Sequence, residues 1–250
     1  ASYYEGLQKK IKLEVEFFRS SSLYSYSIQG MLNYYQLSIE MIIKLTKLNG
    51  EIGVICPSSL FGDVSVSKLR RHILEDNNLL SIDFYPEKDK IFNNVTQATS
   101  IFLMEKGGFT KKIKVSISKN NFKVDFSEIK MAFPERLEVP SINQISWSIL
   151  SKISKNKKLK DIPNIRNRRG ELDLSLFRNF ITKNNTGHML VRGHMLSNRS
   201  INYKNSSEFI DIEGFLKNKS QDYLKNDFGK KRLVCQQISN ASQRNRVNFV

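Results

Sequence analysis

The stretch "GMLNYYQLSIEMIIKLTKLNGEIGVICP", Gly30 to Pro57, decides the fold. In its first part apolar residues recur every three or four positions, at Leu32, Tyr35, Ile39, Ile42 and Leu45. This spacing predicts a helix, and the Asn-Gly pair that ends at Gly50 is a typical C-terminal stop. Residues 51–57 follow as a short apolar, β-branched run, which predicts a buried strand.

The same alternation continues downstream. Residues 65–77 begin with a serine cap and place apolar residues on one side, which predicts a second helix, and residues 78–85 and 97–106 predict two more strands. After the glycine pair at 107–108, residues 111–126 alternate with period two in two runs and predict a hairpin at the sheet edge. Helix and strand in alternation indicate an α/β sheet with helices on its faces. Near the amino terminus, residues 11–17 alternate like a further strand.

The second half of the chain has a different pattern. Two prolines within residues 131–141 predict a linker, a helix is expected at 142–153, and a polar region with scattered short strands follows. We therefore predict a boundary near Glu135, with an α/β domain over residues 1–135 and a mixed α+β domain over residues 136–250. The 250 residues, 40% of them hydrophobic, suffice for two such domains.

The charge is distributed unevenly. Residues 1–135 contain 18 Lys and Arg against 15 Asp and Glu, a formal charge of +3, whereas residues 136–250 contain 22 against 9, a charge of +13. This asymmetry indicates that the second half meets a polyanion, with nucleic acid as the first candidate. The alternative is a basic protein that is kept soluble by a charged surface.

Several classes of site have no sequence support. The chain has no apolar run long enough to span a membrane and no signal peptide, so a soluble, cytoplasmic protein is expected. Its cysteines, Cys56 and Cys235, are too far apart for a zinc site or a disulfide framework. The histidines, His72, His188 and His194, form no HExxH motif, and no metal site is predicted. No GxG, GK[ST] or GxSxG motif occurs, so a Rossmann fingerprint and a P-loop are both absent.

The order of the motifs carries a resemblance to a known family. The run "LNYYQLSIEMIIKLTKLNGEIGVICPSSLFGDVSVSKLRRHIL", followed by "LLSIDFYPEKDKIFNNVTQATSIFLMEKG", resembles the second half of the catalytic domain of adenine-specific DNA methyltransferases from type II restriction-modification systems. Residues 162–240 look like the TaqI-like target-recognition domain of the same enzymes. The resemblance implies a partial Rossmann-like methyltransferase sheet, S-adenosylmethionine as methyl donor, double-stranded DNA as partner and methyl transfer to the adenine exocyclic amine.

The chain departs from this family in two motifs. It contains no Pro-Pro, and therefore no Asn/Asp-Pro-Pro-Tyr/Phe tetrapeptide, and it lacks the glycine loop that binds the methyl donor. Both motifs would precede Tyr3 in the family's order. We therefore expect a carboxy-terminal fragment that is inactive alone, binds S-adenosylmethionine weakly, and needs the amino-terminal part of the same polypeptide. Two alternatives are a segment of a combined restriction endonuclease-methyltransferase and a basic nucleic-acid-binding module without enzymatic activity.

The resemblance also assigns a role to one aromatic residue. Phe92, in "DKIFNNVTQAT", occupies the place of the family's aromatic that stacks on the flipped target base. The alternative is that Phe92 plugs the open end of the sheet.

Cationic and amide side chains of the second half are candidates for contact with DNA. Three arginines precede Gly170, and they can bind phosphate or pair with guanine, or else form a solvated turn: Arg166, Arg168 and Arg169. The remaining candidates are Arg192, His194, Arg199, Lys230, Lys231, Arg232, Gln236 and Gln237. The alternative for the last five is that their segment forms a strand whose glutamines face water.

Overall fold

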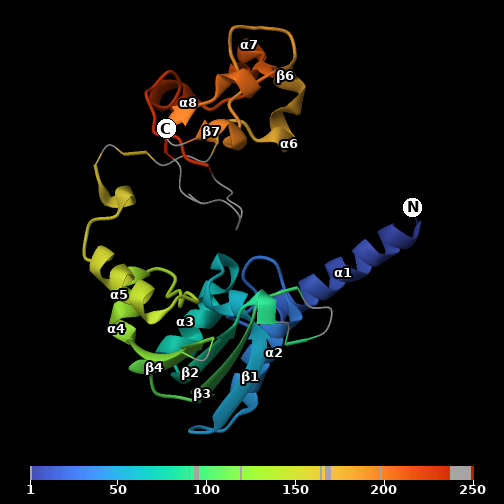
Figure 1. The fold of residues 1–250 in the computed structure, drawn as a ribbon. Coiled ribbons are helices and arrows are strands. Elements are labelled where there is room, and N and C mark those ends of the chain that lie inside the picture. The colour runs from blue at the N-terminus through green and yellow to red at the C-terminus, as the bar shows by residue number, and fades with distance from the viewer. Residues whose placement is uncertain are drawn as a thin grey trace. The chain divides into compact units, whose positions relative to one another are not determined.

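The chain forms two compact units, residues 1–165 and residues 166–250, in a computed structural model (Figure 1). The structure describes residues 2–89, 91–92, 96–118, 120–163, 165–166, 170–197, 199–236 and 249–250. The predicted functional boundary near Glu135 stays a prediction, and the compact units divide 30 residues later.

The first unit is built on a five-stranded mixed sheet. Its helices are α1 (Ser2–Ser20), α2 (Tyr34–Leu45), α3 (Ser67–Glu75), α4 (Phe126–Ala132) and α5 (Gln144–Ile153), and its strands are β1 (Glu51–Pro57), β2 (Asn78–Tyr85), β3 (Thr99–Glu105), β4 (Lys112–Ile117) and β5 (Asn120–Asp125). The strand order is β1-β3-β2-β4-β5. Because β3 is antiparallel to both neighbours and β4 is parallel to β2, the carboxyl ends of β1, β2 and β4 lie at one edge. The α/β class and the β4–β5 hairpin at the sheet edge are confirmed.

One face of the sheet supplies the core. Every second residue of the strands is buried there under α2 and α3, as shown by Ile52 of β1, Ile82 of β2 and Phe102 of β3. On the opposite face Ile55 is 45% exposed and Leu103 is 48% exposed. The strand predicted at 51–57 is therefore confirmed, but it is buried on one face only.

The segment predicted as a linker packs into this core. Leu137 and Val139 are buried, and the backbone N–H of Val139 donates to the carbonyl of Phe61 at 2.8 Å. Trp147 of α5 joins the same cluster. The two prolines mark an irregular backbone, but the apolar side chains between them bind it to the first unit.

The strand predicted at 11–17 is wrong, because these residues belong to α1. Lys, Glu and Leu favour helix, and a helix places Glu14, Val15 and Phe18 on one side, where they are half-buried. The ring of Phe18 lies 5.4 Å from that of Tyr24. The remainder of α1 extends away from the sheet (Figure 1), and its apolar residues are exposed.

The second unit consists of short elements, as predicted. They are α6 (Leu174–Phe177), β6 (Ile181–Thr182), β7 (Leu196–Ser197), β8 (Ser200–Ile201), β9 (Phe209–Ile210), α7 (Ile212–Lys217) and α8 (Gln221–Asn226). β6 pairs with β9 and β7 with β8, both antiparallel. Across the described ranges of both units, no helix combines the length and the apolar character needed to cross a bilayer.

Aromatic rings around one lysine form the centre of the second unit. Lys219 Nζ lies 4.4 Å from the ring centre of Phe177, 4.5 Å from that of Phe215 and 5.0 Å from that of Tyr223, and it donates to the carbonyl of Glu171 at 2.6 Å. Burial lowers the pKa of Lys219, while the Glu171 carboxylate acts in the opposite direction. The ammonium thus links three rings by cation–π attraction.

Candidate functional site

The carboxyl edge of β1 and β2 is the candidate site of the first unit. Pro57 at the end of β1 and Tyr85 at the end of β2 both pair with Thr99 of β3. The backbone N–H of Ser58 donates to the carbonyl of Ala98 at 3.0 Å. Open α/β sheets bind their ligands outside the carboxyl ends of the strands, so this edge is where a ligand is expected.

Hydroxyl groups gather at this edge. The 3-10 helix η1 (Ser58–Phe61) follows β1 directly, and Ser59 Oγ lies 3.4 Å from Tyr35 Oη in the first turn of α2. Ser58 Oγ is buried and has no hydrogen-bond partner in the described part of the chain. A buried polar atom without a partner calls for a ligand or a bound water.

Phe92 lies in the loop that connects β2 to β3 at the same edge. It follows the 3-10 helix η3 (Glu87–Asp89) and is 45% exposed. Much of its surface is therefore accessible to a planar group. Its role in stacking on a base stays a prediction.

Arg70 of α3 holds the turn beneath the site, and the sequence analysis missed it. The guanidinium is fully buried, and its Nη1 donates to the carbonyls of Leu60 at 2.8 Å and Asp63 at 2.9 Å. Its Nε donates to the carbonyl of Arg136 at 2.9 Å. Burial lowers the pKa of Arg70 to about 10, against the opposing effect of Glu138. The only sequence signal was an arginine among the apolar positions of a helix.

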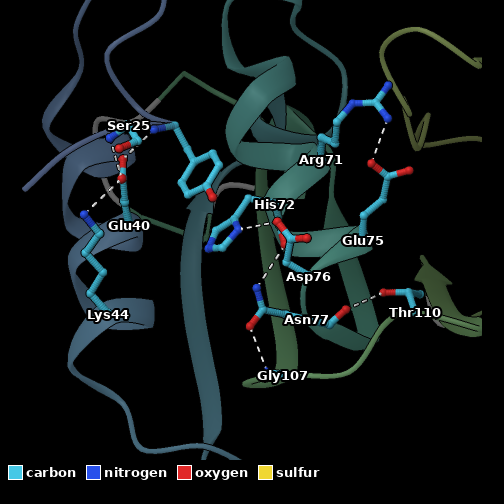
Figure 2. Close-up of polar contacts among 11 residues, drawn as sticks. Ser25, Glu40, Lys44, Arg71, His72, Glu75, Asp76, Asn77, Gly107 and Thr110 are labelled. Atoms are coloured by element: carbon cyan, nitrogen blue, oxygen red, sulfur yellow. Dashed lines mark hydrogen bonds and ion pairs between the residues drawn. The ribbon is translucent and has the colours of Figure 1, made fainter.

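A buried carboxylate fixes the loop before α2. Glu40 accepts hydrogen bonds from the backbone N–H groups of Ser25 at 2.7 Å, Tyr26 at 3.1 Å and Ser27 at 2.8 Å, and from Ser27 Oγ at 2.6 Å. Lys44 Nζ lies 3.6 Å from the same carboxylate (Figure 2). Desolvation raises the pKa of Glu40, but the four hydrogen bonds outweigh it, so the pKa is lowered.

The loop fixed by Glu40 then packs on α3. The Tyr26 ring stacks on the His72 ring with centres 3.9 Å apart, and His72 Nδ1 lies 2.8 Å from Asp76 Oδ2 (Figure 2). Beside them is a hollow of about 460 Å³. Two lysines line it: Lys106 donates to the carbonyls of Lys44 and Thr46, and Lys44 pairs with Glu40, so both ammonium groups already have partners within the fold. No group of three or more potential metal ligands occurs among the described residues.

The first of the three arginines before Gly170 is paired with acidic residues. Arg166 Nη2 lies 2.6 Å from Asp222 Oδ2, and its Nε lies 3.3 Å from Asp227 Oδ1. The other two, Arg168 and Arg169, lie outside the described residues.

Two further candidate arginines are bound internally. Arg192 forms a two-point pair with Glu208, at 2.5 Å from Nε and 3.0 Å from Nη2, and the arginine lowers the pKa of that carboxyl. Arg232 Nη1 lies 2.5 Å from Glu171 Oε1, and its Nη2 donates to the carbonyl of Asp227. Such pairs are typical of arginines that hold a fold together.

The remaining candidates lie on the surface or at its margin. His194, Arg199, Lys230 and Lys231 are exposed, and none forms an ion pair within the described ranges. Gln236 is half-buried against Gly193, and Gln237 lies outside the described residues.

Comparison with known proteins gives one family match. Residues 4–92, fewer than half of the chain, match the family described as Eco57I restriction-modification methylase. No curated protein matches the chain.

Three solved structures resemble part of the chain, each at 18% identity. The modification subunit of a putative type I restriction enzyme from Vibrio vulnificus YJ016 aligns over 37% of this chain and 28% of its own, with a TM-score of 0.34. The type I restriction enzyme EcoKI M protein aligns over 39% and 22%, with a TM-score of 0.33. The type IIG restriction endonuclease BpuSI aligns over 44% and 13%, with a TM-score of 0.34. The match therefore spans 28% or less of the length of each of these proteins.

Proposed function

We propose that this chain is part of an adenine-specific DNA methyltransferase of a restriction-modification system. The intact enzyme transfers a methyl group from S-adenosylmethionine to the adenine exocyclic amine in duplex DNA. The observation that carries the proposal is the family match of residues 4–92, which ends at Phe92 in the loop at the carboxyl edge of the sheet.

The residues at this edge suit an extrahelical base. A base in a duplex must leave the stack before its amine can react, and an aromatic ring then takes over the lost stacking. Phe92 offers its exposed ring for this purpose.

The residues present do not fit the methionine half of the methyl donor. β1 leads directly into Ser58 and Ser59, and β2 leads into Pro86, so neither strand is followed by a glycine turn that lets a ligand approach the backbone. We propose that the amino-terminal part of the intact polypeptide holds the methyl donor.

The outer edge of β1 supports the proposal that an amino-terminal part of the polypeptide completes the enzyme. β1 is the first strand of the sheet and pairs only with β3, so its second edge has no strand partner in the described part of the chain. The middle of β1 carries neither charge nor proline, which are the usual protections of an exposed edge. Ile55 and Leu103 add an exposed apolar face. A strand and a helix from the amino-terminal part would pair with this edge and cover that face.

Contact with DNA is proposed for residues 136–250, where most of the positive charge lies. Two alternatives remain: a combined restriction endonuclease-methyltransferase, and a basic nucleic-acid-binding module without an enzymatic parent. A nuclease motif elsewhere in the reading frame would favour the first of these. The absence of a glycine loop and a Pro-Pro tetrapeptide upstream would favour the second.

The test is methyl transfer by the chain joined to the upstream part of its reading frame, measured with labelled S-adenosylmethionine and duplex DNA. Phe92→Ala should lower kcat strongly, and Phe92→Trp should retain much of it because the ring is kept. Phe109→Ala is the matched control, because Phe109 is an exposed ring at the amino end of β4, on the opposite edge of the sheet.

Two outcomes contradict the proposal. The methyltransferase assignment fails if the longer chain transfers no methyl group to any duplex. The fragment assignment fails if the 250-residue chain alone binds S-adenosylmethionine with low-micromolar affinity in calorimetric titration.

A further inference from the structure

The second unit carries a hairpin with a fixed base and an exposed tip. β7 and β8 pair with Leu196 opposite Ile201, and Arg199 directly precedes β8. Leu196 and the preceding Met195 are buried. The backbone N–H of Asn202 donates to the carbonyl of Met195 at 2.8 Å and extends the ladder. The hairpin is thus rooted in the core of the unit.

Arg199 occupies the tip in an unfavourable backbone conformation. Its φ is 62°, in the left-handed region that glycine adopts freely and that a residue with a Cβ adopts at a cost. Beside it, Ser197 Oγ and Ser200 Oγ lie 2.7 Å apart across the hairpin. An exposed arginine in this conformation is a candidate for a functional side chain.

The arginines of this unit divide into two groups. Arg166, Arg192 and Arg232 are each bound to a carboxylate, as described above. Arg178 and Arg199 are both exposed and form no ion pair with any residue that the structure describes, and of the two only Arg199 lies in the hairpin. Its guanidinium is therefore available to an external partner.

The sequence around the hairpin is depleted in acidic residues. Residues 174–207 contain no Asp or Glu, but they contain five Lys and Arg and two His. His194, Tyr203 and Lys204, on the 3-10 helices η6 (Gly193–Met195) and η7 (Tyr203–Asn205) that flank the hairpin, are exposed. The next acidic residue, Glu208, is neutralised by Arg192. The positive charges of this segment therefore attract phosphate, and the segment has no carboxylate that would repel it.

We infer that the β7–β8 hairpin is the element of the second unit that enters a groove of duplex DNA, with Arg199 at its tip contacting a base edge. The inference rests on the proposed function and adds to it the structural element that recognises the DNA sequence. A two-stranded ribbon fits the major groove, and arginine binds guanine there through two parallel hydrogen bonds. His194 and Lys204 then lie on either side of the hairpin in sequence, as candidates for the flanking phosphates.

Three variants of the whole 250-residue chain test the inference, with a pool of random-sequence duplexes as the probe. Arg199→Gly removes the side chain and suits the positive φ, so its melting temperature should be equal or higher while DNA affinity falls. Arg199→Lys keeps the charge but not the two-point contact. Lys225→Ala removes one exposed charge from α8, outside the hairpin, and serves as the control.

Binding is measured by fluorescence anisotropy, and sequence preference by sequencing the duplexes retained by each variant. For the sequences that the unaltered chain enriches, Arg199→Gly and Arg199→Lys should each weaken binding by roughly fivefold to a hundredfold. On the unselected pool, Arg199→Lys should bind like the unaltered chain. Lys225→Ala should enrich the same sequences as the unaltered chain.

The outcomes separate the inference from the function on which it rests. If the unaltered chain binds no duplex at low salt, DNA binding itself fails, and so does the inference. If the chain binds single-stranded nucleic acid in preference to duplex, the groove contact is wrong. If the unaltered chain binds duplex but Arg199→Gly and Lys225→Ala have equal effects, only the role of the hairpin fails.

Discussion

Replacing Glu40 by glutamine should loosen the loop before α2 in a way that thermal unfolding can measure. The glutamine oxygen can take the place of Glu40 Oε2 and keep the bonds from Tyr26 and Ser27. Its amide nitrogen then takes the place of Oε1 and meets the N–H of Ser25, which is itself a donor. One hydrogen bond is lost, and the other three no longer have a charged acceptor.

The magnitude follows from these four bonds. Hydrogen bonds to a charged group contribute about 1.5–3 kcal/mol and neutral ones about 0.5–1.5 kcal/mol. The lost bond and the three weakened ones therefore sum to about 4.5–7.5 kcal/mol, from which the lower desolvation cost of a neutral amide subtracts. We expect a net loss of about 2–4 kcal/mol, which corresponds to a fall in melting temperature of roughly 4–16 °C for a unit of this size.

Calorimetry on the whole chain is the assay, and Glu75→Gln is the control. Glu75 pairs with Arg71 (Figure 2) and with Lys130, whose side chains are both exposed, so its loss should cost about 1 kcal/mol or less. Since the pKa of Glu40 is lowered on folding, its charge stabilises the fold above the ordinary carboxyl pKa, and this contribution disappears as the pH falls through the folded pKa. The difference between Glu40→Gln and the unaltered chain should therefore shrink in acid. Equal melting temperatures for Glu40→Gln and Glu75→Gln at neutral pH would refute this account.

Two further predictions concern the second unit. Lys219→Ala should lower its stability by about 1–2 kcal/mol in chemical denaturation, because three rings lose their central cation, whereas Lys217→Ala on the surface of α7 should leave the midpoint unchanged. Replacing both Lys230 and Lys231 by alanine should make the slope of log affinity for DNA against log salt shallower by about two. The same double change at Lys9 and Lys10 of α1 should leave the slope unaltered, and an equal effect would contradict a DNA interface in the second half.

Local periodicity predicted most of the first unit because its strands and helices each bury one face. The helix before Gly50 and the alternation of Ile52 with Cys56 are visible in any short window of sequence. The predicted helical face was only partly right, because Ile42 and Leu45 are exposed and Ile43 is buried instead. Residues 11–17 fit the periodicity of a strand and that of a helix, and the helix propensity of their side chains favours the helix that forms. Burial of Leu137 depends on residues far away in the chain, which no local pattern contains.

The candidate site was less predictable for the same reason. Arg166 and Arg192 are ordinary cationic residues in sequence, and their partners Asp222 and Glu208 lie 56 and 16 residues further along the chain. The loop that carries Phe92 could be placed by its position between two strands. The orphan hydroxyl of Ser58 and the buried guanidinium of Arg70 became visible only once the strands were paired.

The position of β3 in the sheet constrains when the chain can fold during its synthesis. β1 and β2 are not neighbours in the sheet, and all their described pairings are with β3 or β4. In a nascent chain that ends before Thr99, β2 therefore has no native partner, and β1 has none among the residues that the structure describes. Such unpaired strands are the species that aggregate or recruit chaperones on the ribosome. Once β3 emerges, it can close the gap between β1 and β2 in a single step, so the first unit should acquire its sheet late and abruptly in translation.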